Sequence, residues 1–283
     1  MSIEQRRAAL ANMLDGFTVA YDRILEQYGL RLPRHLAYGL GWWQGLSEAE
    51  RTDYAGLLGG GPIGIGAWLC EGRYDRVPIL AREPVDPPEL VCVFATPPQD
   101  EARWALWYND PAELPRMLVS AARDGELSAC APTLLGTISD DILGRYDGQD
   151  GGVAWVETVE ADPVLQAVLD WRDEVIALEH DAYQAEAIAP APDLVPGDPM
   201  EPWIDGWEPA DALVTALGRL AAPGVTGELV AAARDKLATE PGWALVVGHA
   251  LHVRGDTAGT ELLVAAYRAL GRGALATIAE TAR

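Results

Sequence analysis

Leu90-Val91-Cys92-Val93-Phe94, followed by Trp104-Ala105-Leu106-Trp107-Tyr108, is the stretch that decides the fold class of this 283-residue chain. Both runs have the length of a β-strand and are bounded by Gly, Pro or Asp, residues that commonly end strands. Two shorter runs upstream have the same texture, namely Ala67-Trp68-Leu69-Cys70 and Val77-Pro78-Ile79-Leu80. Together these four runs predict a small antiparallel sheet.

Helical patterns precede this sheet. Between Ile3 and Tyr28 apolar residues recur at steps of three and four, the period of one buried helix face. Leu32-Pro33 interrupts the pattern, and a second apolar helical stretch ends near Trp42-Trp43. Ser47 with a glutamate three residues later has the spacing of a capping box. The first quarter of the chain is therefore predicted to be helical.

Further helices are predicted after the sheet. Asn109-Asp110-Pro111 suits a helix N-terminus, because a short polar side chain can cap free amides and proline fits the first turn. We expect that helix to run to about Arg123. Two more are expected over 132–143 and 163–186.

The domain organisation follows from a proline-rich segment. Six prolines lie close together before residue 210, in a stretch with few periodic apolar residues, which suits a linker. The remaining sequence is rich in Ala, Leu and Val and predicts four or five helices. We therefore predict an α+β domain over residues 1–188, with helices flanking the sheet, a linker over 189–209 and an all-helical domain over 210–283.

Composition excludes several functional classes. The chain has 43 acidic and 21 basic side chains, a net charge of −22, so it repels the phosphates that a nucleic-acid binder must neutralise. No apolar run is long enough to span a bilayer, and the N-terminus reads into a helix rather than a signal core. We expect a cytoplasmic protein with no direct nucleic-acid or membrane partner, whose three cysteines are reduced.

Motifs for independent catalysis are weak. Gly59–Gly64 formally matches GxGxxG, but it is interpreted as a turn because it leads into an apparent strand. His249 and His252 could share a helix face, yet nearby residues do not complete a metal shell, so satisfied or solvated histidines are expected and no metal is predicted. No nucleophile elbow occurs.

Acidic residues cluster on the helix expected over 163–186. Paired carboxylates could carry out acid–base chemistry if their environments separated their pKa values. In so acidic a chain, a solvated face is the simpler interpretation. The carboxylates concerned are Asp170, Asp173, Glu174, Glu179 and Asp181.

A collinear set of motifs resembles the histone PARylation factor family. Pro87-Pro88-Glu89-Leu90 opens a strand, and Trp107–Pro115 is an aromatic strand followed by an acidic, proline-flanked helix start. Upstream, Leu32-Pro33 and Gly61-Pro62 are similar to the family's Leu-Pro helix entry and Gly-Pro element. Downstream, Ala238–Trp243 is similar to its Asn-Asp-Glu-Cys-Asp-Tyr segment. The resemblance covers most of the chain, and the order of the motifs carries it.

The resemblance implies an accessory factor that binds an ADP-ribosyltransferase of the poly-ADP-ribose polymerase type and completes its active site. The family's acidic glutamate, a general base toward an acceptor serine, corresponds to Glu240. Thr239, Gly242, Trp243 and Trp203 correspond to positions that contact the partner. NAD would be bound only by the partner, so no cofactor is expected, and a protein substrate is a second expected partner. An independent enzymatic activity is not expected from the resemblance, although an enzyme of another class, such as a hydrolase, stays open as a third alternative.

Three departures from the family pattern matter. Thr239 and Gly242 stand where the family has aspartates, which reduces the acidic cluster to one carboxylate. The segment 202–205 lacks the arginine of the family's Tyr-Arg segment. The N-terminal zinc finger of some animal members is absent from the sequence. Partner binding could therefore persist without serine targeting.

An alternative interpretation is a SUKH-like immunity protein that neutralises a toxin by surface binding. Its members also have an N-terminal helix, a Leu-Pro entry and a tryptophan-bearing sheet, and acidity speeds association with basic nucleases. The C-terminal helices favour the first interpretation, because a SUKH domain alone leaves 210–283 unexplained. The two differ at Glu240, which should line an open cleft in the first and be an ordinary surface residue in the second.

Overall fold

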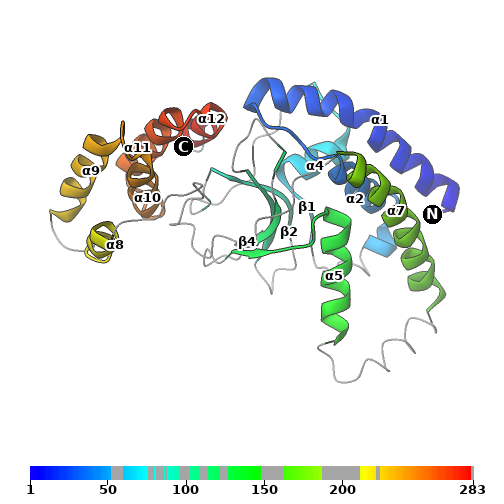
Figure 1. Cartoon of the computed structure of the whole chain (residues 1–283). Coiled ribbons are helices and arrows are strands. Elements are labelled where there is room, and N and C mark those ends of the chain that lie inside the picture. Colours follow the sequence, from blue (N-terminus) through cyan, green and yellow to red (C-terminus); the bar gives the residue numbers. More distant parts are fainter. Residues whose placement is uncertain are drawn as a thin grey trace.

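The α+β prediction is confirmed, with a small antiparallel sheet, flanking helices and further helices in the C-terminal part (Figure 1). The computed structural model describes residues 1–51, 60–75, 80, 86, 88–95, 102–108, 114–115, 117–121, 127–147, 162–186, 211–220 and 224–281. The N-terminal helices and the sheet contribute to the same continuous hydrophobic core as the C-terminal helices. The boundary and linker predicted over 189–209 lie outside the described residues.

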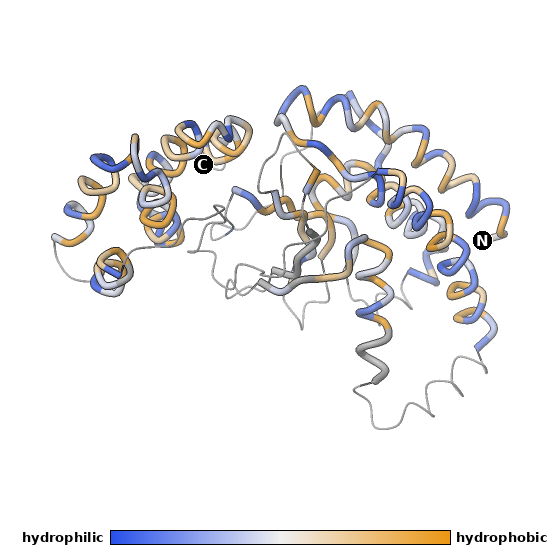
Figure 2. Tube along the Cα trace, in the orientation of Figure 1, coloured by the Kyte–Doolittle hydropathy of each residue, from blue (hydrophilic) through white to orange (hydrophobic). Residues whose placement is uncertain are grey.

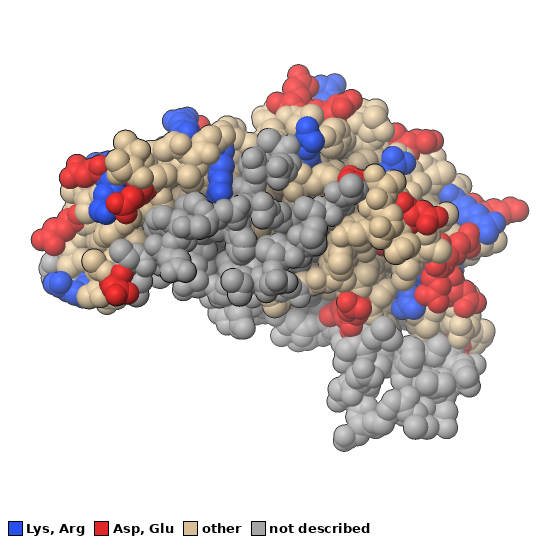
Figure 3. All heavy atoms as spheres, viewed as in Figure 1, with Lys and Arg blue, Asp and Glu red and all other residues tan. Residues whose placement is uncertain are grey.

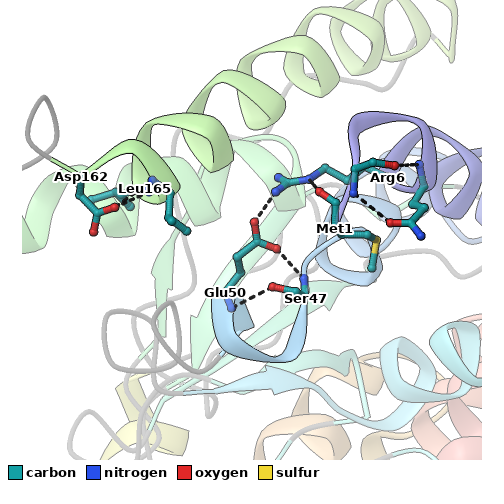
Figure 4. Close-up of polar contacts among 9 residues, drawn as sticks. Met1, Arg6, Ser47, Glu50, Asp162 and Leu165 are labelled. Atoms are coloured by element: carbon teal, nitrogen blue, oxygen red, sulfur yellow. Dashed lines mark hydrogen bonds and ion pairs between the residues drawn. The ribbon is translucent and has the colours of Figure 1, made fainter.

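The N-terminal helices form where the sequence periodicity places them. Helix α1 spans Ile3–Tyr28 and α2 spans His35–Gln44. The Ser47 capping box is also present: the Ser47 N–H donates to the Glu50 carboxylate at 2.6 Å, and the Glu50 N–H donates to Ser47 Oγ at 3.2 Å. Arg6 of α1 forms a buried ion pair with Glu50, which ties the start of α1 to this turn (Figure 4).

Helix α7 is the second long helix and spans Pro163–Glu186, as the sequence predicts. Asp162 precedes it, and one carboxylate oxygen accepts the backbone N–H groups of Val164 and Leu165 at 2.9 and 3.2 Å (Figure 4). Proline at the first helical position has no N–H to satisfy, so the cap and the proline together define the start of the helix. Helix α5, Leu134–Asp147, packs near it.

The sheet has five antiparallel strands in the order β1-β2-β3-β4-β5. The strands are β1 Gly61–Pro62, β2 Leu90–Ala95, β3 Arg103–Trp107, β4 Met117–Ala121 and β5 Leu127–Ala129. Cys92 pairs with Ala105 and Phe94 with Trp104, so Val93 is the extra residue of a β-bulge. The bulge changes the face on which the following side chain lies: Cys92 belongs to a small cluster on one face, whereas Phe94 belongs to the main core.

The predicted strand over 67–70 is wrong, because these residues lie in helix α4, Gly64–Glu71. An apolar run of four residues is too short for its period to separate a strand from a buried helix turn. Gly66 lets this helix approach β2 closely, since a Cβ at that position would lie 2.0 Å from the Val93 carbonyl oxygen. The expectation that the glycine-rich segment leads into a strand is therefore wrong, because helix α4 begins at Gly64. All strand pairs of the described residues are antiparallel, so these residues do not form the parallel βαβ unit of a dinucleotide-binding motif.

The predicted helix from 109 to about 123 is also wrong over its second half. Residues 117–121 form β4, which pairs with β3 from Met117 opposite Trp107 to Ala121 opposite Arg103. Backbone pairing with a strand that is already in place overrides the local helix-start signal. The predicted start of this helix at 109–111 lies outside the described residues. Of the strand predicted over 77–80, only Leu80 is described, and it does not belong to a strand.

Part of the main core lies between the sheet and the N-terminal helices, along which hydrophobic and hydrophilic residues alternate (Figure 2). Three aromatic residues from different elements meet there. Trp43 of α2 packs edge-on against Phe94 of β2, with ring centroids 5.3 Å apart, and Phe94 stacks on Trp104 of β3 at 5.1 Å. Contacts of this kind stabilise a core beyond the apolar area that they bury.

The C-terminal part contains five helices in its described residues, in line with the predicted four or five. They are α8 Asp211–Leu217, α9 Val225–Lys236, α10 Pro241–His252, α11 Thr257–Ala269 and α12 Gly273–Thr281. Helices α10 and α11 share the most extensive contact. Among the helices of the described ranges, none combines the length and apolarity needed to cross a membrane.

Candidate functional site

Glu240 lies at the turn between α9 and α10 and is the N-cap residue of α10. Its side chain makes no capping hydrogen bond, and Pro241 follows at the start of the helix. The side chain is 46% exposed. A carboxylate near a helix N-terminus is favoured by the helix dipole. Glu240 therefore presents a carboxylate at the surface that the helix does not use as a cap. The open cleft that the accessory-factor interpretation expects around Glu240 stays a prediction.

Lys236, the last residue of α9, contacts this carboxylate. Its Nζ donates to Glu240 Oε1 at 3.0 Å and lies 4.3 Å from the centroid of the Trp243 ring. Trp243 is 8% exposed, so its indole ring is held by the surrounding core and has little freedom to move beneath the ammonium. The cation thus lies between an aromatic face and a carboxylate, both of which attract it.

Backbone hydrogen bonds hold the turn itself. The Lys236 carbonyl oxygen accepts the N–H of Thr239 at 3.0 Å and the N–H of Glu240 at 2.7 Å. The Thr239 hydroxyl donates to the same carbonyl oxygen at 3.3 Å. These three hydrogen bonds to the Lys236 carbonyl oxygen fix the backbone at Glu240. The local geometry of the site is therefore set by residues 236–240.

The structure brings together most of the residues that the family resemblance singles out. Glu240 and Thr239 are at least partly exposed, whereas Gly242 and Trp243 are buried in the first turn of α10. Trp203 lies outside the described residues. Sequence reasoning missed Lys236, although its spacing of four residues from Glu240 is that of an ion pair on a helical turn.

A second polar cluster lies at the other end of α10 and is buried. Glu89, which precedes β2, and His249 of α10 are each 2% exposed. Glu89 Oε2 lies 3.8 Å from His249 Nε2, and the Tyr267 hydroxyl of α11 lies 3.4 Å from the same nitrogen. This cluster connects the sheet to the C-terminal helices. Its burial makes it a structural contact rather than a site for a substrate.

The two histidines of α10 do not act as a pair. His252 Nδ1 lies 3.3 Å from Thr260 Oγ1, whereas His249 contacts Glu89 and Tyr267. Among the described residues there is no group of three or more His, Cys, Asp or Glu side chains placed to hold a metal ion. The interpretation of His249 as a satisfied, buried helix histidine fits this geometry.

The predicted solvated face of α7 is wrong at Glu179, which is only 3% exposed. The Thr133 hydroxyl donates to Glu179 Oε2 at 2.8 Å, whereas the buried Oε1 accepts no hydrogen bond from the described residues. Burial nevertheless raises the pKa of the Glu179 carboxyl from its usual 4.5 to about 8, because the charged form is poorly solvated there. Glu179 faces the start of α5 rather than water, so it serves packing between two helices.

His35 of α2 contacts the same helix start. Its Nδ1 accepts the Leu134 N–H at 3.2 Å, which fixes the proton of the neutral ring on the other nitrogen. Burial lowers the pKa of His35 from 6.5 to about 3. The start of α5 is thus held by uncharged acceptors from two neighbouring helices, an arrangement suited to stability rather than to acid–base catalysis.

The tryptophans of the sheet are placed differently from what the alternative interpretation requires. On the face shown in Figure 3, acidic and basic groups lie side by side over α1 and α7 as well as over the C-terminal helices. Trp104 and Trp107 of the sheet are each only 3% exposed. These indoles fill the interior and do not form a tryptophan-bearing binding surface.

Comparisons with known proteins leave the family open. No protein-family model matches this chain, and no curated protein matches it in sequence. The resemblance to the histone PARylation factor family therefore stays a prediction.

Proposed function

We propose that this protein is a cytoplasmic accessory factor that binds an ADP-ribosyltransferase of the poly-ADP-ribose polymerase type and supplies Glu240 to its active site. The observation that carries the proposal is the state of this side chain. Glu240 is the N-cap residue of α10, but its side chain does not cap the helix. Nearly half of the side-chain surface is exposed and could contact a partner. A carboxylate in this position can accept a proton from a bound substrate.

The chemistry asked of Glu240 is general-base catalysis. A serine hydroxyl is a weak nucleophile at neutral pH, and a positioned carboxylate can take its proton as the new bond to the ribose forms. The bond between the ribose carbon and nicotinamide breaks at the same time, and nicotinamide leaves from NAD held by the partner. Oε1 of Glu240 accepts a hydrogen bond from Lys236, so Oε2 is the oxygen that would accept the serine proton.

The proposal assigns this protein one catalytic group and leaves the rest of the site to the transferase. Thr239 and Gly242 cannot add acidic charge where the family has aspartates. Glu240 would therefore act alone, and the serine would be oriented by the partner and by the protein substrate. This division of roles fits a chain in which no independent nucleophile was found in the sequence.

The test is an ADP-ribosylation assay with labelled NAD and a poly-ADP-ribose polymerase from the source organism. Wild type should bind the polymerase and shift modification toward serine, whereas Glu240→Gln should bind equally well and lose the shift. Glu261→Gln is the matched control, because Glu261 is another exposed carboxylate of the C-terminal helices and is paired with Arg234 at 3.0 Å. A Glu240→Gln variant with full activity would refute the proposal.

Absence of any binding to the polymerase would also refute it. The SUKH-like immunity protein would then be the better hypothesis, supported by the net charge of −22. Its own test is protection of cells from a toxin encoded beside this protein.

A further inference from the structure

We propose that Lys236 is the positioning residue that orients the Glu240 carboxylate for proton transfer. This inference rests on the proposed function, because it concerns the same site. It goes further by naming a residue outside the motif of Ala238–Trp243 and by assigning it a separate, measurable role.

The first step of the argument is the asymmetry of the carboxylate contacts. Lys236 Nζ binds Oε1 of Glu240 at 3.0 Å, whereas no hydrogen bond to Oε2 occurs within the part of the chain that the structure describes. A carboxylate held by one oxygen keeps its rotamer and leaves the lone pairs of the other oxygen for a substrate proton. Without Lys236 the side chain would rotate among several rotamers, because its surroundings are half open.

The second step is the fixed position of the ammonium. A lysine side chain is flexible and gains little order from one exposed ion pair. Here the Trp243 ring lies 4.3 Å from Nζ and is itself buried, so the ammonium is attracted from two sides. The aromatic ring thus makes Lys236 a stiffer partner for Glu240 than an exposed lysine would otherwise be.

The third step separates this role from folding. Both side chains of the pair are more than a third exposed, and exposed pairs contribute little to stability. The turn is held instead by the Lys236 carbonyl oxygen, which any residue at this position retains. A substitution of Lys236 should therefore leave the fold unchanged and act on the orientation of the carboxylate alone.

The experiment compares Lys236→Met, Lys236→Arg and Glu240→Gln in the ADP-ribosylation assay with the polymerase. Lys236→Met should lower the serine-directed rate about tenfold at unchanged polymerase affinity, since small losses of alignment reduce rates strongly. Lys236→Arg should restore the rate to within about threefold of wild type, because a guanidinium can both bind a carboxylate and stack on an indole. Arg234→Met is the matched control on the same helix, since Arg234 pairs with Glu261 instead, and it should retain the wild-type rate.

The outcomes separate the two proposals. Full activity of Lys236→Met, together with loss in Glu240→Gln, overturns the positioning role and leaves the proposed function standing. Full activity of Glu240→Gln overturns both. Failure of Lys236→Arg to recover activity while Lys236→Met is inactive also overturns the positioning role, because the charge and the stacking would then be insufficient.

A direct measurement uses the fact that Lys236 is the only lysine of the chain. Reductive methylation with ¹³C-formaldehyde labels this side chain and the N-terminal amine, and it keeps the positive charge. The dimethyl-lysine resonance should be displaced by the Trp243 ring in both proteins, but its position should differ between wild type and Glu240→Gln, because the ammonium loses its contact with the carboxylate. An identical resonance in both proteins would mean that the carboxylate does not hold the lysine, which would overturn the inference.

Discussion

Replacing Glu179 with glutamine should change how the stability of this protein depends on pH. Glu179 is buried between α7 and the start of α5, and burial raises its pKa to about 8 from the 4.5 of an exposed glutamate. Between these two pH values the folded protein keeps a proton on Glu179, whereas the unfolded chain loses it. The unfolded state binds fewer protons, so the free energy of unfolding falls as the pH rises.

The magnitude follows from the same two pKa values. Over the window between them, each pH unit should remove up to about 1.4 kcal/mol from the free energy of unfolding. Glutamine is uncharged in both states, and its carbonyl oxygen can still accept the hydrogen bond from the Thr133 hydroxyl. From about pH 5.5 to about pH 7.5, Glu179→Gln should therefore gain about 3 kcal/mol relative to wild type.

The assay is urea unfolding followed by tryptophan fluorescence at several pH values, with Glu174→Gln as the control. Glu174 lies on the same helix but is exposed and paired with Arg7, so its substitution should change stability by a constant small amount. Unfolding free energies of wild type and Glu179→Gln that run parallel across this pH range would refute the reasoning. They would mean that Glu179 is charged in the folded protein despite its burial.

Two further pairs of substitutions test the packing of the fold by the same urea assay. Gly66→Ala should destabilise the protein by about 3 kcal/mol, because its Cβ would collide with the Val93 carbonyl oxygen, whereas Gly227→Ala, in open space on α9, should stabilise it by about 0.5 to 1 kcal/mol. His249→Leu should cost about 3 kcal/mol by leaving the buried Glu89 carboxylate without its nearby imidazole, and adding Glu89→Leu should recover most of that loss. Equal stability of the two glycine variants, or no recovery in the double variant, would contradict these expectations.

Long periodic segments could be predicted from the sequence with accurate boundaries. The apolar period over 3–28 gives α1 its full length, and the proline after Asp162 marks the start of α7. Such helices repeat the same signal over many turns, so a local pattern is sufficient. The strands predicted at 90–94 and 104–108 correspond to β2 and β3 within one residue at each end, because their apolar runs are bounded by strong turn residues.

Short segments could not be predicted, because their structure depends on distant partners. The apolar run at 67–70 is compatible with a strand or with a buried helix turn. In the structure it lies in a helix, which packs closely on β2 at Gly66. Residues 117–121 become a strand by pairing with β3. In both cases a tertiary contact, absent from the local pattern, determines the result.

The contacts at the candidate sites also divide into local ones, which the sequence spacing indicates, and distant ones, which it does not. Lys236 and Glu240 are four residues apart, so their contact was within reach of sequence reasoning. Glu89 and His249 are separated by most of the chain, and only the folded protein places one near the other. The burial of Glu179 was hidden for another reason: its acidic neighbours on α7 are exposed, and the sequence does not show that α5 covers this one position.

The bulge at Val93 gives strand β2 one residue more than its pairing with β3 uses. The extra residue turns Phe94 inward, toward Trp104 and Trp43. Because Cys92 and Phe94 already lie opposite successive residues of β3, deleting Val93 would close the bulge and keep both pairs in register and both faces unchanged. Inserting one further residue here would instead exchange the inner and outer faces for the rest of the strand. Among descendants of this sequence, β2 should therefore tolerate the loss of this residue better than the gain of another.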